Sequence, residues 1–559
     1  MKILIEGEKY PIEDLERIFK SAQFYYPQGY QGIVKAVGYY HSTETNELVF
    51  MLPKVFMRDA EQTVWGISKE ELCQIGERST SIKHDEQFEW LRNLSVFFYK
   101  SLVLYKKKFP ESELINYSPT YQLKGLRTTQ QYSYLDILLS FVSFYKRNSS
   151  HILYKHIDAV HANPKKPKWE KTIRKGSPIL IDDKSFIYDR VRTKSKAVDN
   201  EEDLIIYFLS IINYFNEQHS LGLHLDKIYP IIKGKRFIEL KKNGLQKLKK
   251  IKYRYFTDML KSMHSLCMIF FSQYDQASAK VQEDFITISS YNIVFEEMVD
   301  RLFSDELEEK SVGGVTLSQL KHNLDGKVID HLFDHTSLLD DSRIFYIGDS
   351  KYYKSGTQAH DLSRYKQFTY AKNVIQYNID LLNDGSRTYK PGLRYRDELT
   401  EGYNLTPNFF IYGYIDKPND YSLNELRPNG DIVPSFHFKN RLFDRDTLFV
   451  HQYKINFLFV LKAYVTFSTD AVSKFRSEVR DTFKKEFVTY FSDSTKCGFE
   501  FYRLKTEIDS EAFINQHFKI LNGKVYTTSN NEILLALCKE EDDKKLLQLL
   551  GDFEKHTIQ

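Results

Sequence analysis

The clearest pattern of hydrophobic and polar positions lies between residues 291 and 382. Val294, Met298 and Leu302 recur at every fourth position, each with an apolar neighbour, so this stretch is predicted to be an amphipathic helix. A second stripe at helical spacing contains Leu362, Tyr365, Phe368, Ala371, Ile375, Ile379 and Leu382. Between the two helices the pattern predicts a β-hairpin, with one strand at Val328–Phe333 and a second strand that ends near Lys351.

The predicted hairpin places two carboxylates opposite each other. Turn residues occupy positions 339–342, and a fold between Leu339 and Asp340 leaves Asp330 and Asp349 equally far from the turn. Directly opposed residues of an antiparallel pair have Cβ atoms about 4.5–5.5 Å apart. A slip of one residue would move every side chain to the other face, so this register is a specific prediction.

Asp349 and Lys351 are two positions apart, so on a strand they share the face that also carries Phe345 and Ile347. Charges on such a face are costly unless they are paired or bound to a metal. Two carboxylates held this close repel each other when both are ionised, and a divalent cation between them removes the conflict. Hard oxygen ligands suit Mg²⁺, with Mn²⁺ as an alternative. Glu296 lies at the edge of the first helix's apolar stripe and can reach the same site.

The flanking regions follow other patterns. Residues 1–80 are predicted to be β-rich, and residues 84–148 and 204–215 show helical apolar stripes. Individual predictions are a helix at Ile12–Phe24, a strand at Gln31–Tyr40, a helix at Val472–Tyr490, a strand near Gly498–Leu504, and helices at Asn531–Lys539 and Asp542–Phe553.

Two basic stretches stand out from the rest of the chain. Residues 165–175 hold six lysines or arginines around one tryptophan, and residues 227–261 predict a helix with one buried and one basic face. The candidate nucleic-acid contacts are Lys168, Trp169, Lys171, Arg174, Lys249, Lys250 and Arg254. Their cations suit phosphates and the ring suits base stacking. A solvated basic surface is the alternative interpretation of both stretches.

Composition narrows the class of protein. Of 559 residues, 28% are charged and 42% are hydrophobic, which is typical of a globular chain with about two to four domains. The net charge of +4 neither requires nor excludes nucleic acid. The cysteines show no paired spacing, so we expect neither a zinc site nor a disulfide framework; they are Cys73, Cys267, Cys497 and Cys538.

Several other classes of protein find no support. No signal peptide and no apolar run long enough to span a membrane is found, so a bacterial, cytoplasmic protein without membrane contact is expected. The chain has no G-x-S-x-G motif of a serine hydrolase and no phosphate-binding loop of an NTPase. Histidines at positions 331, 335 and 360 lie near the acidic cluster, but the sequence does not indicate a three-histidine metal site.

The order of these pieces resembles a known family. A helix with Glu296, then Asp330, then Asp349-Ser350-Lys351 and a further helix resemble the core of PD-(D/E)XK nucleases, with Ile329 where proline usually stands. The run D-S-K-Y-Y at 349–353, followed by K-Q-F-T-Y at 366–370, is similar to the DNA-cleaving subunits of LlaJI and McrC restriction systems. Shorter similarities to these systems lie at L-P-K, 52–54, and at W-E-K-T-I, 169–173.

The resemblance implies a restriction endonuclease of an anti-phage defence system. Such a deoxyribonuclease uses Mg²⁺, cuts double-stranded DNA and works with a separate McrB-like AAA+ GTPase, and it can be a homo-oligomer. Asp330, Asp349 and the Ser350 carbonyl would then hold the metal, with Glu296 acting through water or a second ion. Lys351 would orient or help to deprotonate the attacking water or stabilise the transition state, and Gln367 would steady Lys351 or the phosphate. A catalytically inactive nuclease-fold subunit that binds DNA or serves as a scaffold is the alternative.

The expected fold class is α/β in the sense of an α+β multidomain protein. We expect a β-rich region with helices at residues 1–125, for which the same resemblance implies DNA recognition, and a helical middle region with basic patches at 126–284. The PD-(D/E)XK nuclease domain, a mixed sheet flanked by helices, is assigned to residues 285–475, and an accessory tail to 476–559.

Overall fold

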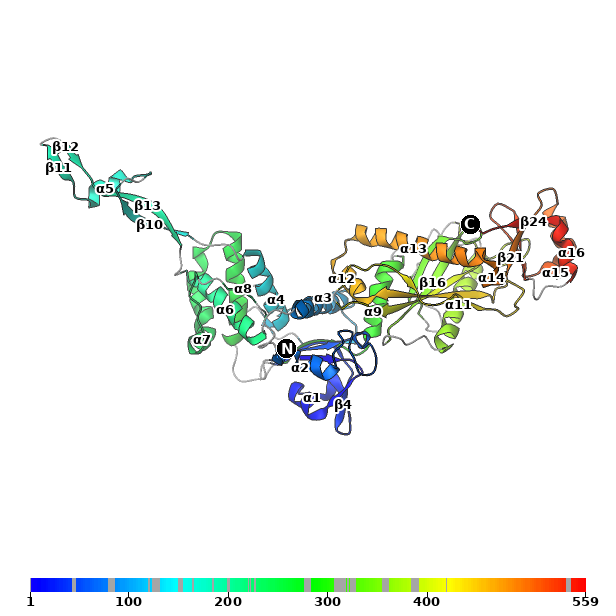
Figure 1. Ribbon diagram of the computed structural model, residues 1–559, viewed down its shortest axis with the longest axis horizontal. Helices are drawn as coiled ribbons and strands as arrows, with labels where there is room; N and C mark the ends of the chain where they lie inside the picture. Colours follow the sequence, from blue (N-terminus) through cyan, green and yellow to red (C-terminus); the bar gives the residue numbers. More distant parts are fainter. Residues whose placement is uncertain are drawn as a thin grey trace.

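The computed structural model describes residues 2–42, 47–78, 86–118, 121–122, 131–148, 154–162, 165–182, 185–198, 202–219, 221, 223–225, 228–275, 283–305, 318, 321, 328–353, 361–383, 392–418, 420–538 and 544–558. The molecule is elongated and mixes helices with several sheets (Figure 1). An arm and a helical bundle lie at one end, and the largest sheet and the carboxy-terminal sheet lie at the other.

Among the described residues, the largest sheet has six strands. Along the sheet their order is β15 (His331–Thr336), β16 (Arg343–Lys351), β17 (Pro407–Tyr414), β20 (Leu448–Asn456) and β18 (Arg427–Pro428), with β19 (Val433–Ser435) also paired to β20. β15 and β16 form an antiparallel hairpin, whereas β16, β17 and β20 are parallel neighbours. Parallel strands need a crossover connection, and α11 (Asp361–Asn383) lies in the connection between β16 and β17.

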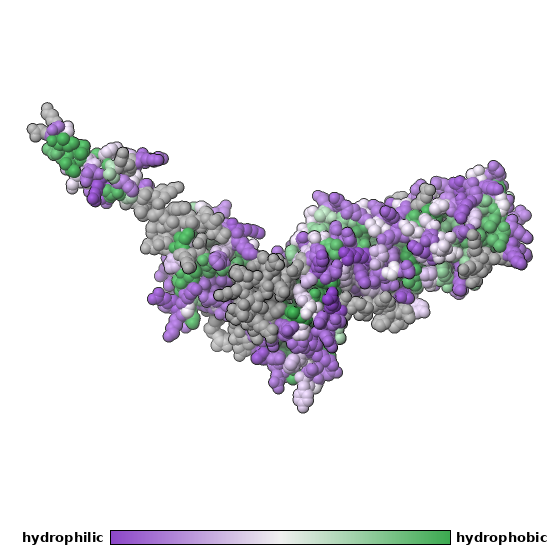
Figure 2. Space-filling model, in the orientation of Figure 1, coloured by the Kyte–Doolittle hydropathy of each residue, from purple (hydrophilic) through white to green (hydrophobic). Residues whose placement is uncertain are grey.

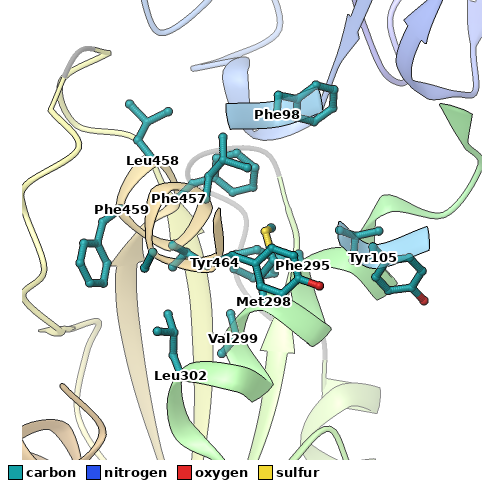
Figure 3. Packing of buried hydrophobic residues seen from close by; sticks show 14 of the residues in the cluster. Phe98, Tyr105, Phe295, Met298, Val299, Leu302, Phe457, Leu458, Phe459 and Tyr464 are labelled. Carbon is teal, nitrogen blue, oxygen red and sulfur yellow. The ribbon is translucent and has the colours of Figure 1, made fainter. Parts of the chain in front are cut away.

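Helices cover both faces of this sheet. Phe409 contacts Phe483 of α13 (Thr469–Ser492) on one face. The next residue, Phe410, must point to the opposite face, where it packs near Phe368 of α11. α9 (Tyr291–Phe303) lies on the same side as α13, and α12 (Phe457–Thr466) packs on α9. Figure 3 shows the buried residues of α9 and α12 together with Phe98 and Tyr105 of α3 (Glu86–Lys108), which fix this long helix to the core.

A second sheet holds the amino-terminal strands. Its order is β1 (Lys2–Ile5), β6 (Leu48–Leu52), β5 (Val37–Ser42), β14 (Glu283–Ile288) and β7 (Ile115–Ser118). Around it lie β2 (Lys9–Pro11), α1 (Ile12–Ile18), η1 (Ala22–Phe24), β3 (Tyr25–Gln28), β4 (Gln31–Val34), η2 (Lys54–Phe56) and α2 (Lys69–Arg78). The expected boundaries at 284/285 and 475/476 therefore fall inside β14 and α13, and the four-part division itself stays a prediction.

Middle segments of the chain form a helical bundle and a projecting arm (Figure 1). The bundle contains α4 (Tyr134–Asn148), α6 (Asp203–His219), α7 (Lys235–Ile251), η3 (Lys252–Arg254) and α8 (Asp258–Asp275), with the short pair β8 (Tyr121–Gln122) and β9 (Gln131–Tyr132). The arm consists of β10 (Tyr154–His161), β13 (Val191–Val198), α5 (Trp169–Lys175), β11 (Ile179–Asp182) and β12 (Ser185–Ile187). Stacked rings of Phe141 and Phe208 join α4 to α6.

Several predicted elements differ from the structure. The prediction of a helix at Asn531–Lys539 is wrong, because Ile533–Leu537 is the buried strand β23. A short, fully apolar run looks the same in a buried strand and in a buried helix, and here strand pairing on both sides decides. The strand predicted at Gln31–Tyr40 is two strands of different sheets, the helix at Ile12–Phe24 ends at Ile18, and the strand predicted from Val328 begins at His331.

The rest of the tail surrounds β23. It contains α14 (Ser494–Cys497), β21 (Glu500–Leu504), α15 (Ser510–Leu521), β22 (Val525–Thr527), α16 (Lys544–Leu549), η4 (Leu550–Asp552) and β24 (Phe553–His556). The four strands form a sheet in the order β22, β23, β21, β24. All four cysteines lie in described residues, and no disulfide joins them. Within the described residues, no helix is both long and apolar enough to cross a membrane.

Candidate active site

The β15–β16 hairpin has the register that the sequence predicts. His331 pairs with Gly348 and Thr336 pairs with Arg343, so Asp330 directly precedes the strand and the same register places it opposite Asp349. The backbone N–H of Ser350 donates a hydrogen bond to Oδ2 of Asp330 at 3.3 Å, and the two carboxyl groups also share a hydrogen bond. The hairpin therefore brings together two acidic groups that are 19 residues apart in the chain.

Lys351 completes this cluster. Its ammonium group forms an ion pair with Oδ2 of Asp349, and its Nζ lies 5.4 Å from the centre of the Phe410 ring. The side chain of Asp349 is 10% exposed and that of Lys351 is 17% exposed, so both are largely buried but still reach solvent. An ammonium group that faces two carboxyls can hold an anion close to them, which is an arrangement suited to a phosphate group.

Glu296 approaches the same cluster from α9. Asn292 donates a hydrogen bond to its Oε1 at 3.4 Å. Burial and, to a smaller extent, the charge of Asp349 raise the pKa of Glu296 to about 7, against the hydrogen bond from Asn292 and the charge of Lys351. The helix α9 and the β15–β16 hairpin thus meet at the acidic cluster, as the sequence predicts. Glu296 lies within electrostatic range of both Asp349 and Lys351.

Burial and the neighbouring charges shift the pKa values of the groups in the cluster. Burial, together with the hydrogen bond and the charge of Asp349, raises the pKa of Asp330 well above its ordinary value. Burial alone would lower the pKa of Lys351, but the charges of Asp349 and Asp330 outweigh it and the pKa is raised. If Asp330 and Glu296 ionised together with Asp349, three carboxylates and one ammonium would leave a surplus of negative charge, which a divalent cation would neutralise.

The donor atoms of the expected metal site are of a type that suits Mg²⁺. Two carboxylates and one backbone carbonyl, that of Ser350, are hard oxygen donors of the kind that Mg²⁺ prefers. In the part of the chain that the structure describes, no group of three His, Cys, Asp or Glu side chains is arranged as a metal site. The expected ligands include two carboxylate side chains, those of Asp330 and Asp349, besides Glu296. One oxygen of Asp349 already forms an ion pair with Lys351.

Gln367 lies beneath the cluster rather than within it. This α11 residue is fully buried, and its amide Nε2 donates hydrogen bonds to the Ile347 carbonyl at 2.8 Å and to Oδ1 of Asn408 at 3.3 Å. Both partners belong to the sheet, so in this structure Gln367 ties α11 to the strand that carries Asp349. Its expected role in steadying Lys351 or a phosphate directly stays a prediction.

A second polar network lies behind the cluster, on the face of the sheet covered by α9. The His331 ring, which is fully buried, contacts Oδ1 of Asp300 through Nδ1 at 3.3 Å and the Ser350 hydroxyl through Nε2. Nζ of Lys321 lies 2.8 Å from the same Asp300 oxygen. Burial opposes ionisation of Asp300, but the hydrogen bond from His331 and the charge of Lys321 hold its pKa well below the ordinary value.

The hydrogen bonds of this network explain the buried position of His331 without a role as a metal ligand. Burial lowers the pKa of His331, so a neutral ring that donates to Asp300 is left to accept from the Ser350 hydroxyl. Both ring nitrogens are then engaged within the protein, and Ser350 is held at the strand position whose carbonyl is a candidate ligand. The sequence did not reveal the network, because its members come from separate elements with no common spacing. His360 lies outside the described residues.

Tyr352 connects the cluster to the amino-terminal sheet. Its hydroxyl donates to Oε2 of Glu6 at 2.7 Å and accepts from the backbone N–H of Lys54 at 3.0 Å. Nζ of Lys54 also lies 4.9 Å from the centre of the Tyr352 ring. The L-P-K segment and the D-S-K-Y-Y run, which are far apart in the chain, are therefore neighbours in space.

The two sets of candidate nucleic-acid residues lie far from the acidic cluster. Lys168, Trp169, Lys171 and Arg174 belong to or border α5 of the arm, and Lys249, Lys250 and Arg254 lie at the end of α7 and in η3. Figure 1 places both at the opposite end of the molecule from β16. Trp169 is 53% exposed. Whether these residues contact nucleic acid stays a prediction.

The arm ends in an apolar surface, the arm tip, formed by Ile179, Leu180, Ile181, Phe186 and Ile187. These side chains are between 49% and 69% exposed, and Figure 2 shows them as a hydrophobic cluster at the far end of the molecule. Exposed apolar surface of this kind is typical of an interaction site.

Comparisons with known proteins place the chain in no family. No protein-family profile matches it, and no curated protein matches it. A chain of one solved structure, a refined half-complex of Thermococcus gammatolerans McrB AAA+ hexamers with bound McrC, is similar at 12% sequence identity and a TM-score of 0.26. The match covers 86% of this chain and 99% of that chain. At this TM-score the similarity carries neither fold nor function over to the present protein.

Proposed function

We propose that the protein is a Mg²⁺-dependent endonuclease that hydrolyses phosphodiester bonds of double-stranded DNA in a bacterial restriction system. The observation that supports this function is the meeting of Asp330, Asp349 and Lys351 at the end of one hairpin, with Glu296 approaching from α9. Phosphodiester hydrolysis needs such a set, because charge builds up on the phosphate and a water must be activated beside it.

The residues have separate roles in this proposal. Asp330, Asp349 and the Ser350 carbonyl would hold the metal, and Glu296 would act through water or a second ion. When bound, Mg²⁺ would lower the pKa of a water and neutralise charge on the phosphate. Lys351 is a cation beside two carboxyls, so its contribution is to hold the scissile phosphate and stabilise its developing charge.

A partner is part of the proposal. The sequence resemblance to LlaJI and McrC subunits implies a McrB-like AAA+ GTPase, and this chain lacks a phosphate-binding loop of its own. The arm tip is a surface suited to a protein partner, because its apolar side chains project far from the body of the molecule. Cytoplasmic location and assembly into a homo-oligomer belong to the same proposal.

One observation favours the alternative of a non-cleaving DNA-binding or scaffold subunit. The ion pair between Lys351 and Asp349 neutralises one carboxylate within the protein itself, so the fold can tolerate the cluster without a metal. A scaffold would keep the same hairpin for its stability alone.

Cleavage of supercoiled plasmid in Mg²⁺ distinguishes the two functions. Asp349→Ala and Lys351→Ala should each lower the cleavage rate by at least a hundredfold while DNA binding stays within about twofold. Asp341→Ala is the matched control, because Asp341 is an exposed carboxylate of the same hairpin and should leave cleavage unchanged. If the Asp349→Ala/Lys351→Ala double variant cuts at the parent rate, the proposed catalytic cluster is wrong. The assay includes a McrB-like GTPase from the same genome, with GTP.

A further inference from the structure

Two aromatic side chains in the segment that follows α7 are almost fully exposed. Tyr253 is 83% exposed and Phe256 is 82% exposed, although neither lies at a chain terminus. Large rings in this state gain nothing from burial within the chain, and a phenylalanine has no polar group that water could solvate. Their exposure leaves two aromatic faces open to a ligand.

The fold holds both rings outward. Tyr255, which lies between them, is buried and its hydroxyl donates to Glu202, so this residue anchors the segment next to the start of α6. The preceding helix is fixed as well, since a Cβ at Gly244 would lie 2.7 Å from the Phe271 ring of α8. With α7 packed this closely and Tyr255 turned inward, the neighbouring side chains face solvent.

Cations surround the two rings. Lys249, Lys250, Lys252 and Arg254 are all exposed, and within the described residues none of them forms an ion pair with a carboxylate. Nζ of Lys252 lies 5.8 Å from the centre of the Tyr253 ring. The nearest exposed carboxylate along the chain, Asp258, pairs with Lys261 at 3.7 Å. Figure 2 shows hydrophilic side chains over the outer side of the bundle where α7 lies.

We propose that Tyr253 and Phe256, with Lys249, Lys250, Lys252 and Arg254, form a binding site for unpaired bases of single-stranded DNA. Phosphates would contact the cations, and bases would stack on the two rings. The site, called here the stacking site, deepens the proposed DNA-cleaving function by naming the form of DNA that the bundle holds.

The chemistry favours a single strand over a duplex. Bases in a duplex are already stacked and paired, so their faces are closed to side chains, whereas an unpaired base offers a face to any aromatic ring. Three residues span at most about 10 Å, so both rings can contact nearby bases of one strand. A protein partner would cover the rings equally well, but the uncompensated positive charge around them favours a polyanion.

Fluorescence anisotropy with a labelled oligothymidylate tests the stacking site. An oligonucleotide of about 12 nucleotides is long enough for sites of this kind. The measurement is made in EDTA, so that no cleavage occurs, with the full chain and with a duplex of equal length for comparison. Tyr253→Ala/Phe256→Ala should bind the single strand at least tenfold more weakly and the duplex within about twofold of the parent.

Controls separate stacking from other effects. Tyr30→Ala removes another exposed ring, 94% exposed, and should leave binding unchanged. Tyr253→Trp/Phe256→Trp should restore the affinity, because tryptophan also stacks. Thermal melting of the variants should match the parent, since neither ring is buried.

The proposal is wrong if the double alanine variant binds the single strand as tightly as the parent does. It is also wrong if both DNA forms lose affinity equally, or if only binding of an AAA+ partner is lost. The result is independent of the nuclease assignment, because Asp349→Ala should bind the oligonucleotide like the parent. The binding and cleavage assays together therefore distinguish a protein that has the stacking site but does not cleave DNA from one that cleaves DNA but lacks the stacking site.

Discussion

At the scale of single residues, Gly348 shows how packing shapes the strand that carries Asp349. A Cβ at this position would lie 2.1 Å from Cε2 of Phe409 on the neighbouring strand, so no larger residue fits. The Phe409 ring cannot give way easily, because it stacks on Phe483 with ring centres 4.6 Å apart. The glycine before Asp349 is therefore a packing requirement of the sheet.

Gly348→Ala should destabilise the protein by about 1–3 kcal/mol, the usual cost of overpacking a core. Urea unfolding measures this loss, and a double-mutant cycle with Phe409→Ala tests its cause. Removal of the ring opens space, so the cost of Gly348→Ala should be clearly smaller in the Phe409→Ala background. Strict additivity of the two changes would show that Phe409 is not the obstacle.

Counting residues from the turn was enough to predict that Asp330 lies opposite Asp349, because a hairpin pairs positions at equal distances from its turn. It could not predict the contact of His331 with Asp300 and Ser350, which depends on how α9 packs on the sheet. Periodicity shows which face of an element is buried, but it does not show which polar groups meet within the core.

At the scale of elements, α11 supports β16 through one buried amide. The sequence places Gln367 beside the helix's apolar stripe, and the structure shows its side chain bonded to the Ile347 carbonyl of the strand. The short apolar run at Ile533–Leu537 was predicted to be helical. This prediction is wrong, because the run pairs with a neighbouring strand and is itself the strand β23. The long periodic segment that forms α11 was therefore predicted correctly, whereas the short apolar run that forms β23 was not.

Gln367→Leu should lower the free energy of unfolding by about 1–3 kcal/mol, because it leaves the Ile347 carbonyl and the Asn408 side chain without this donor. Chemical denaturation measures the change. Lys366→Ala is the matched control, since Lys366 is exposed and should alter stability by no more than about 0.5 kcal/mol. Equal effects of the two substitutions would contradict the supporting role of Gln367.

At the scale of the whole molecule, distant parts of the chain close the amino-terminal sheet. β14 pairs with β5 and β7, and Asp284 on β14 is fully buried, where it accepts hydrogen bonds from the Tyr39 hydroxyl and the Tyr134 backbone N–H. Such pairings join segments more than 160 residues apart, so no local pattern indicated them. Burial raises the pKa of Asp284 from 3.8 to about 8, against the effect of these hydrogen bonds.

This shift makes stability depend on pH. Between pH 4 and pH 8 the folded protein binds a proton at Asp284 that the unfolded chain releases, so the contribution is full below pH 4 and is lost as the pH rises toward 8. Asp284→Asn lacks this proton, and its melting temperature relative to the parent should therefore rise between pH 5 and pH 8. Thermal melts at both pH values measure it, and a constant difference would contradict the account.

The central claim is that Asp330 and Asp349 of one hairpin form a cation site, and calorimetric titration with Mg²⁺ tests it most directly. The parent and Asp341→Asn should bind Mg²⁺ with the same affinity, whereas Asp330→Asn and Asp349→Asn should lose the binding. Retention of the parent's binding heat by Asp330→Asn and Asp349→Asn, or no binding by the parent, would contradict it.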